Sequence, residues 1–415
     1  QRADGNPFFL EQLAITLIDD GSLEGTPGAY RLRRPTGELR VSGSIAAVIA
    51  ARVDRLPIGA KSALEAAGVL GDPITRELIA AMQGMEAARA QELLDLCISA
   101  GLLSRSIQVA HAVEGSVFVF RHALVREAIV SALTRARIKA LHRQAFVALL
   151  ARPGADEADA APALAHHAYK GEEWQHAARY AVASMSRAIS RSANQEALRL
   201  FELGVDSSRR VDGPATAQPL ELALRLEAIG AMMALGHIDD IFSNMESAEA
   251  IAMGLNDQRA LASIATQTAV FLWMRGRFEQ GLAHATKGLE AARMAQRRHM
   301  QMAAHQTRLM NLHALGRYAE ASEEGNTLLQ SYEPELAQHR MQPGWAAIPV
   351  INLCSFHAST LWRLGDLPAA QAICDKAYAV LRDVDHPYSS LLIDLVQGQI
   401  WMEQGRFDEA EALLA

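Results

Sequence analysis

A motif that returns at nearly constant spacing is the sequence feature that most restricts the fold. It consists of a Gly, a polar or basic residue, an aromatic or apolar residue and, three positions later, a residue that is usually small. Its copies begin at Gly236, Gly276, Gly316, Gly365 and Gly405, which gives spacings of 40, 40, 49 and 40 residues. A period of this size predicts a solenoid in which each unit is one helical hairpin.

Three residues of the motif have a role in such a hairpin. The Gly permits a left-handed turn at the end of the first helix, the aromatic residue inserts between neighbouring helices, and the small residue lets two helices approach closely. The units resemble tetratricopeptide repeats that are longer than the usual repeat of about 34 residues. Weaker copies at Gly171 and Ser192 place the start of the array near Asp159. We expect the nine extra residues before Gly365 to form a longer loop within residues 333–344.

The first 150 residues lack this period. Two apolar helical stretches are broken at Pro57, and two more end at Gly101. Short β-type segments follow at 102–106 and 116–120, and one more helix comes after them. This order predicts a winged-helix domain over 41–153, followed by a solenoid of about six to seven repeats over 154–415 that is truncated at its C-terminal end. The expected fold class is all-α with a small β-wing.

Composition narrows the functional classes. The net charge of −7 argues against nucleic-acid binding by the whole chain. The three cysteines show no paired framework, which favours a reducing cytoplasm. No apolar run reaches the roughly 18 residues of a membrane span. The first residues contain charges where a signal peptide needs an apolar segment, so we do not expect a signal peptide. We therefore expect a cytoplasmic protein with no membrane partner.

Three segments resemble one family of ATPases. The strings GNPFFLEQL (5–13), AARVDRLPIGAKSALEAAGVLG (50–71) and FRHALVREAIVSAL…RIKALHRQAFVALL (120–150) are similar to the end of the ATPase module in bacterial signal-transduction ATPases with numerous domains. Adenylate or guanylate cyclase-linked members and LuxR-type large ATP-binding regulators share this order, followed by repeats. The resemblance implies that residues 1–40 end the ATPase helical (lid) region. It also implies that the intact protein binds ATP or ADP with magnesium.

The chain itself lacks the motif that binds nucleotide phosphates. A P-loop reads GxxxxGK[ST], and its backbone amides and Lys surround the phosphates. The nearest string, GAKS from Gly59, has Ala where the second Gly is needed and does not follow a strand. We therefore expect this chain to be no enzyme, with no catalytic residues and no cofactor of its own.

A histidine at the start of a helix raises a sharper hypothesis. The string RHALVRE (121–127) is similar to the Met-His-Asp motif in the winged-helix domain of plant resistance ATPases and animal apoptosome-type relatives. The resemblance implies that His122 contacts an ADP phosphate in the intact protein, although Ala123 replaces the acidic residue of the motif. The alternative is a structural histidine that bonds to a backbone carbonyl at the helix start.

Two other groups of polar residues carry weaker hypotheses. Basic residues around 121–143 could contact DNA, but they fall around the helix and not on one stripe, so we do not expect nucleic acid to be a partner. His166, His167, His176 and Glu172 could be assembled into a metal site. Adjacent histidines point about 100° apart on a helix, so we expect no metal. Cys354 and Cys374 are expected to be buried free thiols.

The repeat units align a row of large side chains. Three residues before the five glycines lie Met233, Trp273, His313, Trp362 and Met402, and Met310 lies one turn earlier than His313. One hypothesis is a groove for an apolar peptide or helix, anchored by Trp273 and Trp362. The alternative is that long helices close the groove and bury this row as core. The six partner-binding candidates are Met233, Trp273, Met310, His313, Trp362 and Met402.

Two classes of function follow from these features. The chain could be the regulatory or sensor arm of a signalling ATPase, in which the solenoid binds a protein, a peptide or a small-molecule inducer and the winged helix couples that event to the nucleotide state. It could instead be a non-catalytic scaffold, or the corresponding part of a LuxR-type transcription regulator.

Overall fold

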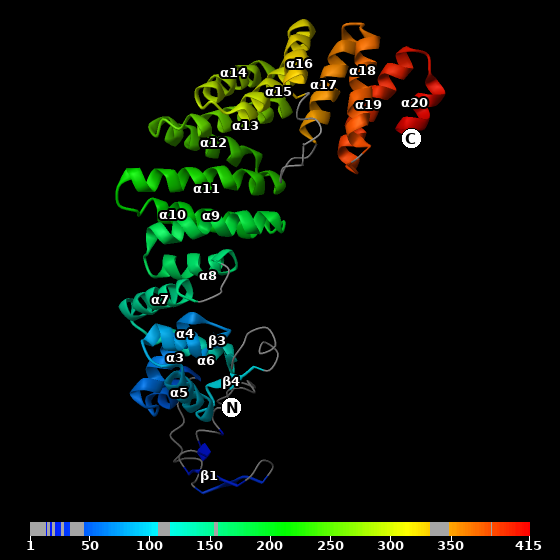
Figure 1. Cartoon of the computed structure of the whole chain (residues 1–415). Coiled ribbons are helices and arrows are strands. Elements are labelled where there is room, and N and C mark those ends of the chain that lie inside the picture. Colours follow the sequence, from blue (N-terminus) through cyan, green and yellow to red (C-terminus); the bar gives the residue numbers. More distant parts are fainter. Residues whose placement is uncertain are drawn as a thin grey trace. The chain divides into compact units, whose positions relative to one another are not determined.

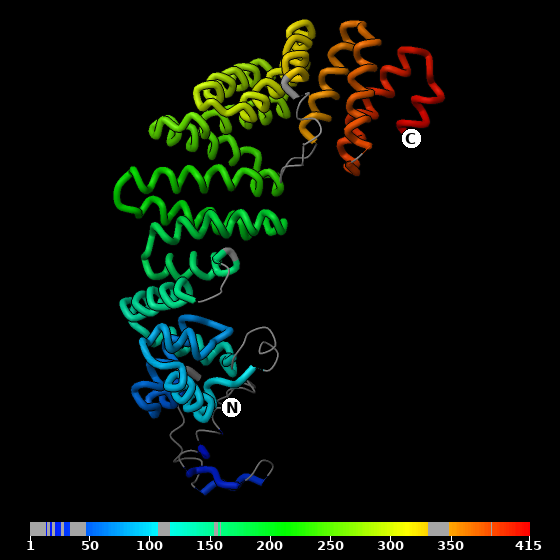
Figure 2. Tube along the Cα trace, in the orientation of Figure 1, coloured from blue at the N-terminus to red at the C-terminus, as the bar shows by residue number. Residues whose placement is uncertain are grey.

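The protein is described by a computed structural model that covers 14, 17–18, 21–25, 29–33, 45–106, 117–152, 157–332, 348–382 and 384–415. The chain forms two compact units, Gln1–Ser184 and Met185–Ala415. Figure 1 labels most of the elements, and Figure 2 traces the chain through them. The described part is mainly helical and has few strands, which confirms the expected fold class.

The first unit contains a winged-helix arrangement. Pro57 precedes α3 and separates it from α2, so the predicted break is confirmed. The helices are α2 (Ile45–Asp54), α3 (Ile58–Leu70), α4 (Arg76–Gln83), α5 (Ala87–Ser99), α6 (Ala123–Ser131), α7 (Arg135–Leu150), α8 (Glu157–Lys170) and the first part of α9 (Trp174–Ser190). The strands are β1 (Leu23–Glu24), β2 (Arg31–Leu32), β3 (Ile74–Thr75), β4 (Leu103–Arg105) and β5 (Val117–Phe120).

The predicted wing is present and carries a third strand. β4 and β5 pair antiparallel, with Leu103 opposite Phe120. β3 pairs with the other edge of β5, which gives the order β3-β5-β4. We did not expect β3, because two residues are too short for an alternating pattern. Phe118 is fully buried and joins the sheet to the helical core. β1 and β2 form a separate hairpin.

We expected one helix after the wing, but the structure has two, α6 and α7. Thr134 lies at the start of α7, and the Thr134 hydroxyl accepts a hydrogen bond from the Arg137 amide at 3.2 Å. Threonine is a favoured N-cap because its side chain satisfies an amide that lacks a partner in the helix. α7 therefore begins at Arg135 as a separate helix.

The second unit contains the main part of the repeat array (Figure 1). Its helices after α9 are α10 (Asn194–Ser208), α11 (Pro214–Ala234), α12 (Ile238–Gly254), α13 (Gln258–Met274), α14 (Phe278–Met294), α15 (Arg298–Ala314), α16 (Tyr318–Tyr332), α17 (Pro349–Arg363), α18 (Leu367–Leu381), α19 (Pro387–Glu403) and α20 (Phe407–Leu414). Consecutive helices pack against each other as hairpins. The expected longer loop at 333–344 lies outside the described residues.

The glycine turns have the predicted left-handed conformation. Gly236, Gly276, Gly316, Gly365 and Gly405 all have φ between 72° and 84°. In the weak copy at Gly171 the positive φ belongs instead to Glu172, at 58°. Gly171 serves packing, because a Cβ there would lie 3.0 Å from the Arg143 side chain.

The first compact unit extends beyond the expected domain boundary at 153/154. It reaches Ser184 and so includes α8 and part of α9. The physical reason is that α8 packs against α7, the last helix of the winged-helix domain. The expected domain bounds themselves stay predictions, but α8 and the first part of α9 share one compact unit with the wing.

Candidate coupling joint and partner-binding cleft

His122 lies at the N-terminus of α6. Its extended backbone precedes the first helical residue, and its Nδ1 accepts a hydrogen bond from the Leu124 amide at 3.1 Å. The side chain is exposed. An Nδ1 that accepts a hydrogen bond carries no proton, so this geometry needs the tautomer protonated on Nε2. His122 thus has a structural role as an N-cap, and its contact with an ADP phosphate stays a prediction.

Side chains of α6 and α7 both form hydrogen bonds with helix α3. From α6, the Arg126 side chain donates through Nε to the Gly68 carbonyl of α3 at 2.8 Å. From α7, Arg137 donates through Nε to the Glu65 carboxylate of α3 at 3.0 Å. A charge-assisted bond is stronger and shorter than a neutral one. The helix that His122 caps is therefore tied through one intermediate helix to α7.

The opposite side of α7 is tied to the first repeat hairpin. Arg143 forms an ion pair with Glu173 at 2.7 Å and donates through Nε to the Gly171 carbonyl at 2.9 Å. Lys139 pairs with Glu172 in the same turn. Phe146 packs its ring against His176, with the centroids 5.0 Å apart. We call these contacts, together with the His142–His167 bond described next, the α7–α8 joint.

Two buried histidines form the centre of the α7–α8 joint. The Nδ1 atoms of His142 and His167 lie 2.9 Å apart, so one ring donates a proton and the other accepts it. Burial is the main cause that lowers the pKa of His142 to about 3 and of His167 to about 4. The neighbouring His166 and the cations Lys170 and Arg126 lower the pKa of His142 further. Both rings are neutral at pH 7.

His142, His166 and His167 pack together at the α7–α8 joint. The ring centroids of His166 and His167 are 5.2 Å apart with planes at 81°, and His142 completes the group. Across the residues that the structure describes, no group of three or more His, Cys, Asp or Glu side chains is arranged to hold a metal ion. His176 instead stacks with Tyr180.

Two members of the candidate row, Trp273 and His313, pack against the same aromatic residue of α17. The Trp273 ring of α13 meets Phe356 of α17 edge to face, with the centroids 5.7 Å apart. His313 of α15 contacts the same Phe356 at 5.9 Å, and its Nδ1 lies 2.9 Å from the Thr360 hydroxyl. Met310 is buried. This stretch of the row therefore lies in aromatic packing between first helices, which lowers the pKa of His313 through burial.

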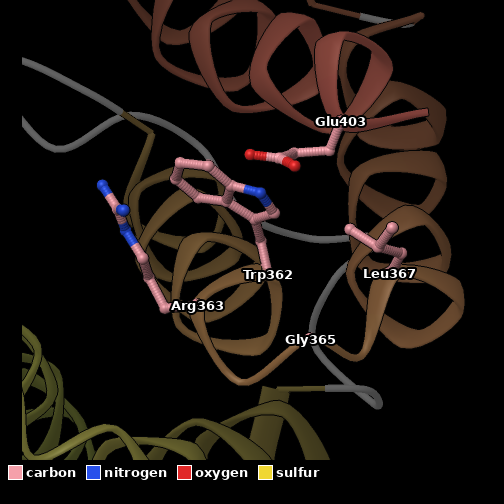
Figure 3. A pocket seen from close by; sticks show the side chains of 5 residues that line it. All are labelled: Trp362, Arg363, Gly365, Leu367 and Glu403. Atoms are coloured by element: carbon pink, nitrogen blue, oxygen red, sulfur yellow. The ribbon is translucent and has the colours of Figure 1, made fainter. Parts of the chain in front are cut away.

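Trp362 has a different environment, because it lines an open cleft. The cleft has a volume of about 290 Å³ and is lined by Trp362, Arg363, Gly365, Leu367 and Glu403. The Arg363 guanidinium lies 4.1 Å from the Trp362 ring centroid, a cation–π distance. Figure 3 shows the indole between that guanidinium and the Glu403 carboxylate of α19. In the described part of the chain, the Glu403 side chain has no hydrogen bond or ion pair.

The other two candidates are exposed. Met233 and Met402 leave 38% and 44% of their surface open to solvent. Trp273 and Trp362 are both only half-buried, so neither is a fully enclosed core residue. The structure therefore does not bring the six candidates into one continuous groove. Binding by any of them stays a prediction, and the cleft beside Trp362 is where an open surface exists.

Sequence reasoning missed the residues around Trp362. Arg363 and Glu403 lie two residues before Gly365 and Gly405, next to the row that we aligned. They carry opposite charges, so a search for one shared residue type could not find them. It also missed His142 as the partner of His167, because the two are 25 residues apart. No short-range pattern indicates such a contact.

The GAKS string lies in a helix and the three cysteines are buried. Gly59 of the GAKS string lies within α3, in no loop, and Lys61 of that string pairs with Asp54. The three cysteines are free and buried, and burial raises the pKa of Cys354 and of Cys374 to about 12. Among the described helices, none is long and apolar enough to cross a membrane.

The fold therefore defines a helical-repeat protein joined to a winged helix. Residues 352–376 and 392–415 match the tetratricopeptide repeat family, and these two segments cover most of the last two hairpins. Such repeats use extended surfaces to bind other proteins.

Comparison with known proteins gives partial matches. An uncharacterized protein of Rhizobium meliloti (strain 1021) is 29% identical over 231 residues, which are 55% of this chain and 21% of that protein. This chain therefore spans about a fifth of that relative.

Solved structures also give partial matches. A Signal Transduction ATPase with Numerous Domains (STAND) protein with a tetratricopeptide repeat sensor, from Pyrococcus horikoshii, is 11% identical, with a TM-score of 0.46. The match covers 91% of this chain and 66% of that one. TPR-like repeats of the kinesin light chain type from Podosopora anserina are 16% identical, with a TM-score of 0.40, over 50% of this chain and 96% of that one. At these TM-scores we draw no functional argument from the structures.

Proposed function

We propose that this chain is the regulatory arm of a signalling ATPase. The repeat array binds a partner protein or peptide, and the winged helix couples that event to the nucleotide state of the intact protein. ATP or ADP with magnesium then binds to a part of the protein other than this chain. A nucleotide cyclase or a DNA-binding domain of the LuxR type is the output that the sequence resemblance favours.

One observation carries this proposal, namely the set of contacts from the first repeat hairpin to His122. The α7–α8 joint fixes α8 to α7, Arg137 fixes α7 to α3, and Arg126 fixes α3 to α6. Packed helices joined by directional bonds shift together more readily than they deform. A displacement of the first hairpin therefore has a physical route to the residue that the family resemblance assigns to ADP.

The His122 side chain allows a test that separates a nucleotide role from a structural one. In the intact protein, His122→Ala removes both the N-cap and the imidazole, so we expect faster ADP release and a loss of about 0.5–2 kcal/mol in stability. His122→Asn keeps a good N-cap but removes the imidazole. It should therefore release ADP about tenfold faster than the wild type while the melting temperature changes little.

The measurements are the rate of ADP dissociation and the melting temperature of the three proteins. If His122→Asn retains ADP like the wild type, His122 is only a helix cap and the proposed link to the nucleotide fails. The alternative function, a scaffold that docks proteins constitutively, then becomes the better account.

A further inference from the structure

The α12–α13 and α14–α15 connections lie at one edge of the array and carry a basic surface that contains methionines. Consecutive helices from α12 to α15 pack against each other (Figure 1), so the ends of α12 and α14 lie at the same edge as the starts of α13 and α15. Ala262 of α13, Ala292 of α14 and Met300 of α15 form one apolar cluster at this edge. We call its exposed side chains the Met/Arg edge, which consists of Met253, Arg259, Arg293, Met294, Arg297 and Arg298.

The two methionines of the Met/Arg edge are strongly exposed. Met253 and Met294 each leave 65% of their surface open to solvent. α11 packs against α12 and α16 packs against α15, so both side chains stay exposed although the neighbouring helices are in place. Met and Arg are enriched in protein–protein interfaces, and methionine adapts its shape to different partners. Exposed methionines among arginines therefore indicate a contact surface for another protein.

The arginines of the Met/Arg edge are not used for pairing inside the chain. Residues 287–299 contain four Lys or Arg and one Asp or Glu, in a chain whose net charge is −7. Within the residues that the structure describes, the side chains of Arg259, Arg293 and Arg297 form no hydrogen bond or ion pair. Their positive charge is therefore available to a partner of opposite charge.

The stability of α15 does not account for the arginines at its start. Arg297 is the N-cap residue and makes no side-chain capping bond, and the first turn contains Arg298 and His299 but no acidic residue. The positive end of the helix dipole disfavours cations at this position. α14 differs, because Arg277 at its start is followed by Glu279 in the first turn. A sequence that departs from such a local rule without a structural gain indicates a functional requirement.

We propose that the Met/Arg edge binds an acidic segment of a partner protein that also carries apolar side chains. This inference rests on the proposed function, because it names the partner of the same repeat array. Carboxylates of the segment pair with the arginines, and its apolar side chains cover Met253 and Met294. None of the six side chains of the edge is an aromatic ring on which a nucleic-acid base could stack, which favours a protein partner. Complementary charge provides specificity and fast association.

Three model peptides test the proposal on the whole 415-residue chain. The probe is a peptide of about 10 residues made of Glu and Leu, which in extended form is long enough to cross neighbouring helices about 8–10 Å apart. One control peptide has Gln in place of every Glu, and the other has Ser in place of every Leu. We expect saturable one-to-one binding of the Glu/Leu peptide by calorimetry, at least about tenfold tighter than that of either control.

Substitutions then locate the site. Arg293→Gln combined with Arg297→Gln is expected to weaken binding about tenfold and to reduce its dependence on salt. Met253→Gln combined with Met294→Gln is expected to weaken binding about threefold. All four residues are exposed, so both variants should fold, which circular dichroism checks. Arg277→Gln is the matched control, because Arg277 is also an exposed N-cap residue without a capping bond but lies at the other end of α14.

Several results would overturn the proposal. Equal affinity for the Glu/Leu peptide and either control would mean that charge or apolar contact is not used. Tighter binding of a single-stranded DNA of about 10 nucleotides would mean that the edge binds nucleic acid. Unchanged binding by the arginine variant would place the site elsewhere.

The His122→Asn test uses no peptide, so the two proposals can fail separately. Absence of peptide binding together with faster ADP release would contradict only this inference. Peptide binding at the Met/Arg edge together with unchanged ADP release would contradict only the proposed coupling to the nucleotide.

Discussion

Acidification from pH 6.5 to pH 4 is expected to destabilise the first compact unit steeply. The unfolded chain protonates its histidines below about pH 6.5, whereas in the folded state the pKa of His142 is about 3 and that of His167 about 4. A folded-state pKa below the unfolded value means that the stabilisation is complete above pH 6.5 and is lost as the pH falls. The loss is about 1.4 kcal/mol per pH unit for each histidine that stays neutral only when folded.

His142→Gln is the matched variant for this prediction. Glutamine can still bond to His167, but it does not titrate, so the pH dependence should become shallower by roughly 1.4 kcal/mol per pH unit. Trp174 is the one tryptophan among residues 1–184. Urea unfolding can therefore be followed by its fluorescence in a background where the other tryptophans are Phe. Equal slopes for the variant and the parent would show that His142 is accessible and titrates normally.

Replacing Gly325 with Ala is expected to disrupt the α16–α17 contact. A Cβ at this position would lie 2.1 Å from Nδ1 of His357, whose side chain is buried. Real Cβ atoms do not approach other atoms so closely, so the buried His357 ring or one of the two helices must shift. Overpacking of this kind costs about 1–3 kcal/mol or more in the free energy of unfolding.

Gly254→Ala provides the control for Gly325→Ala. Gly254 also lies in a helix, but a Cβ there meets nothing within 4 Å. Because Ala has the higher helix propensity, this variant should be more stable by about 0.5–1 kcal/mol. The melting temperatures of the second unit should thus move in opposite directions. A stable Gly325→Ala protein would mean that α16 and α17 do not pack as closely as described.

The turns of the array were predictable because their cause is local. A left-handed turn needs a residue that tolerates positive φ, and the spacing of Gly236, Gly276 and Gly316 therefore marks each hairpin. The β4–β5 wing was predictable for a similar reason, since Val117–Phe120 is a short apolar run with strong strand preference. Both signals lie within a few residues of the structure that they determine.

The candidate sites were less predictable because they depend on what covers each side chain. Leu391 and Ile351 have the same place in their repeats, yet only Ile351 is buried. Sequence periodicity identifies an apolar face but not its neighbour. The His142–His167 bond joins two helices and depends on how α7 meets α8. For the same reason the row containing Trp273 and Trp362 divides into a packed part and an open part.

Hydrogen exchange tests the central claim most directly, because it shows whether the first hairpin and the helix capped by His122 respond together. His167→Ala removes the partner of His142 within the α7–α8 joint. If the joint transmits a change, amides of α6 should exchange at least about threefold faster in this variant, together with those of α7. Glu202→Ala, an exposed change on α10, should leave both helices unchanged. Faster exchange in α7 and α8 with unchanged exchange in α6 would contradict the account.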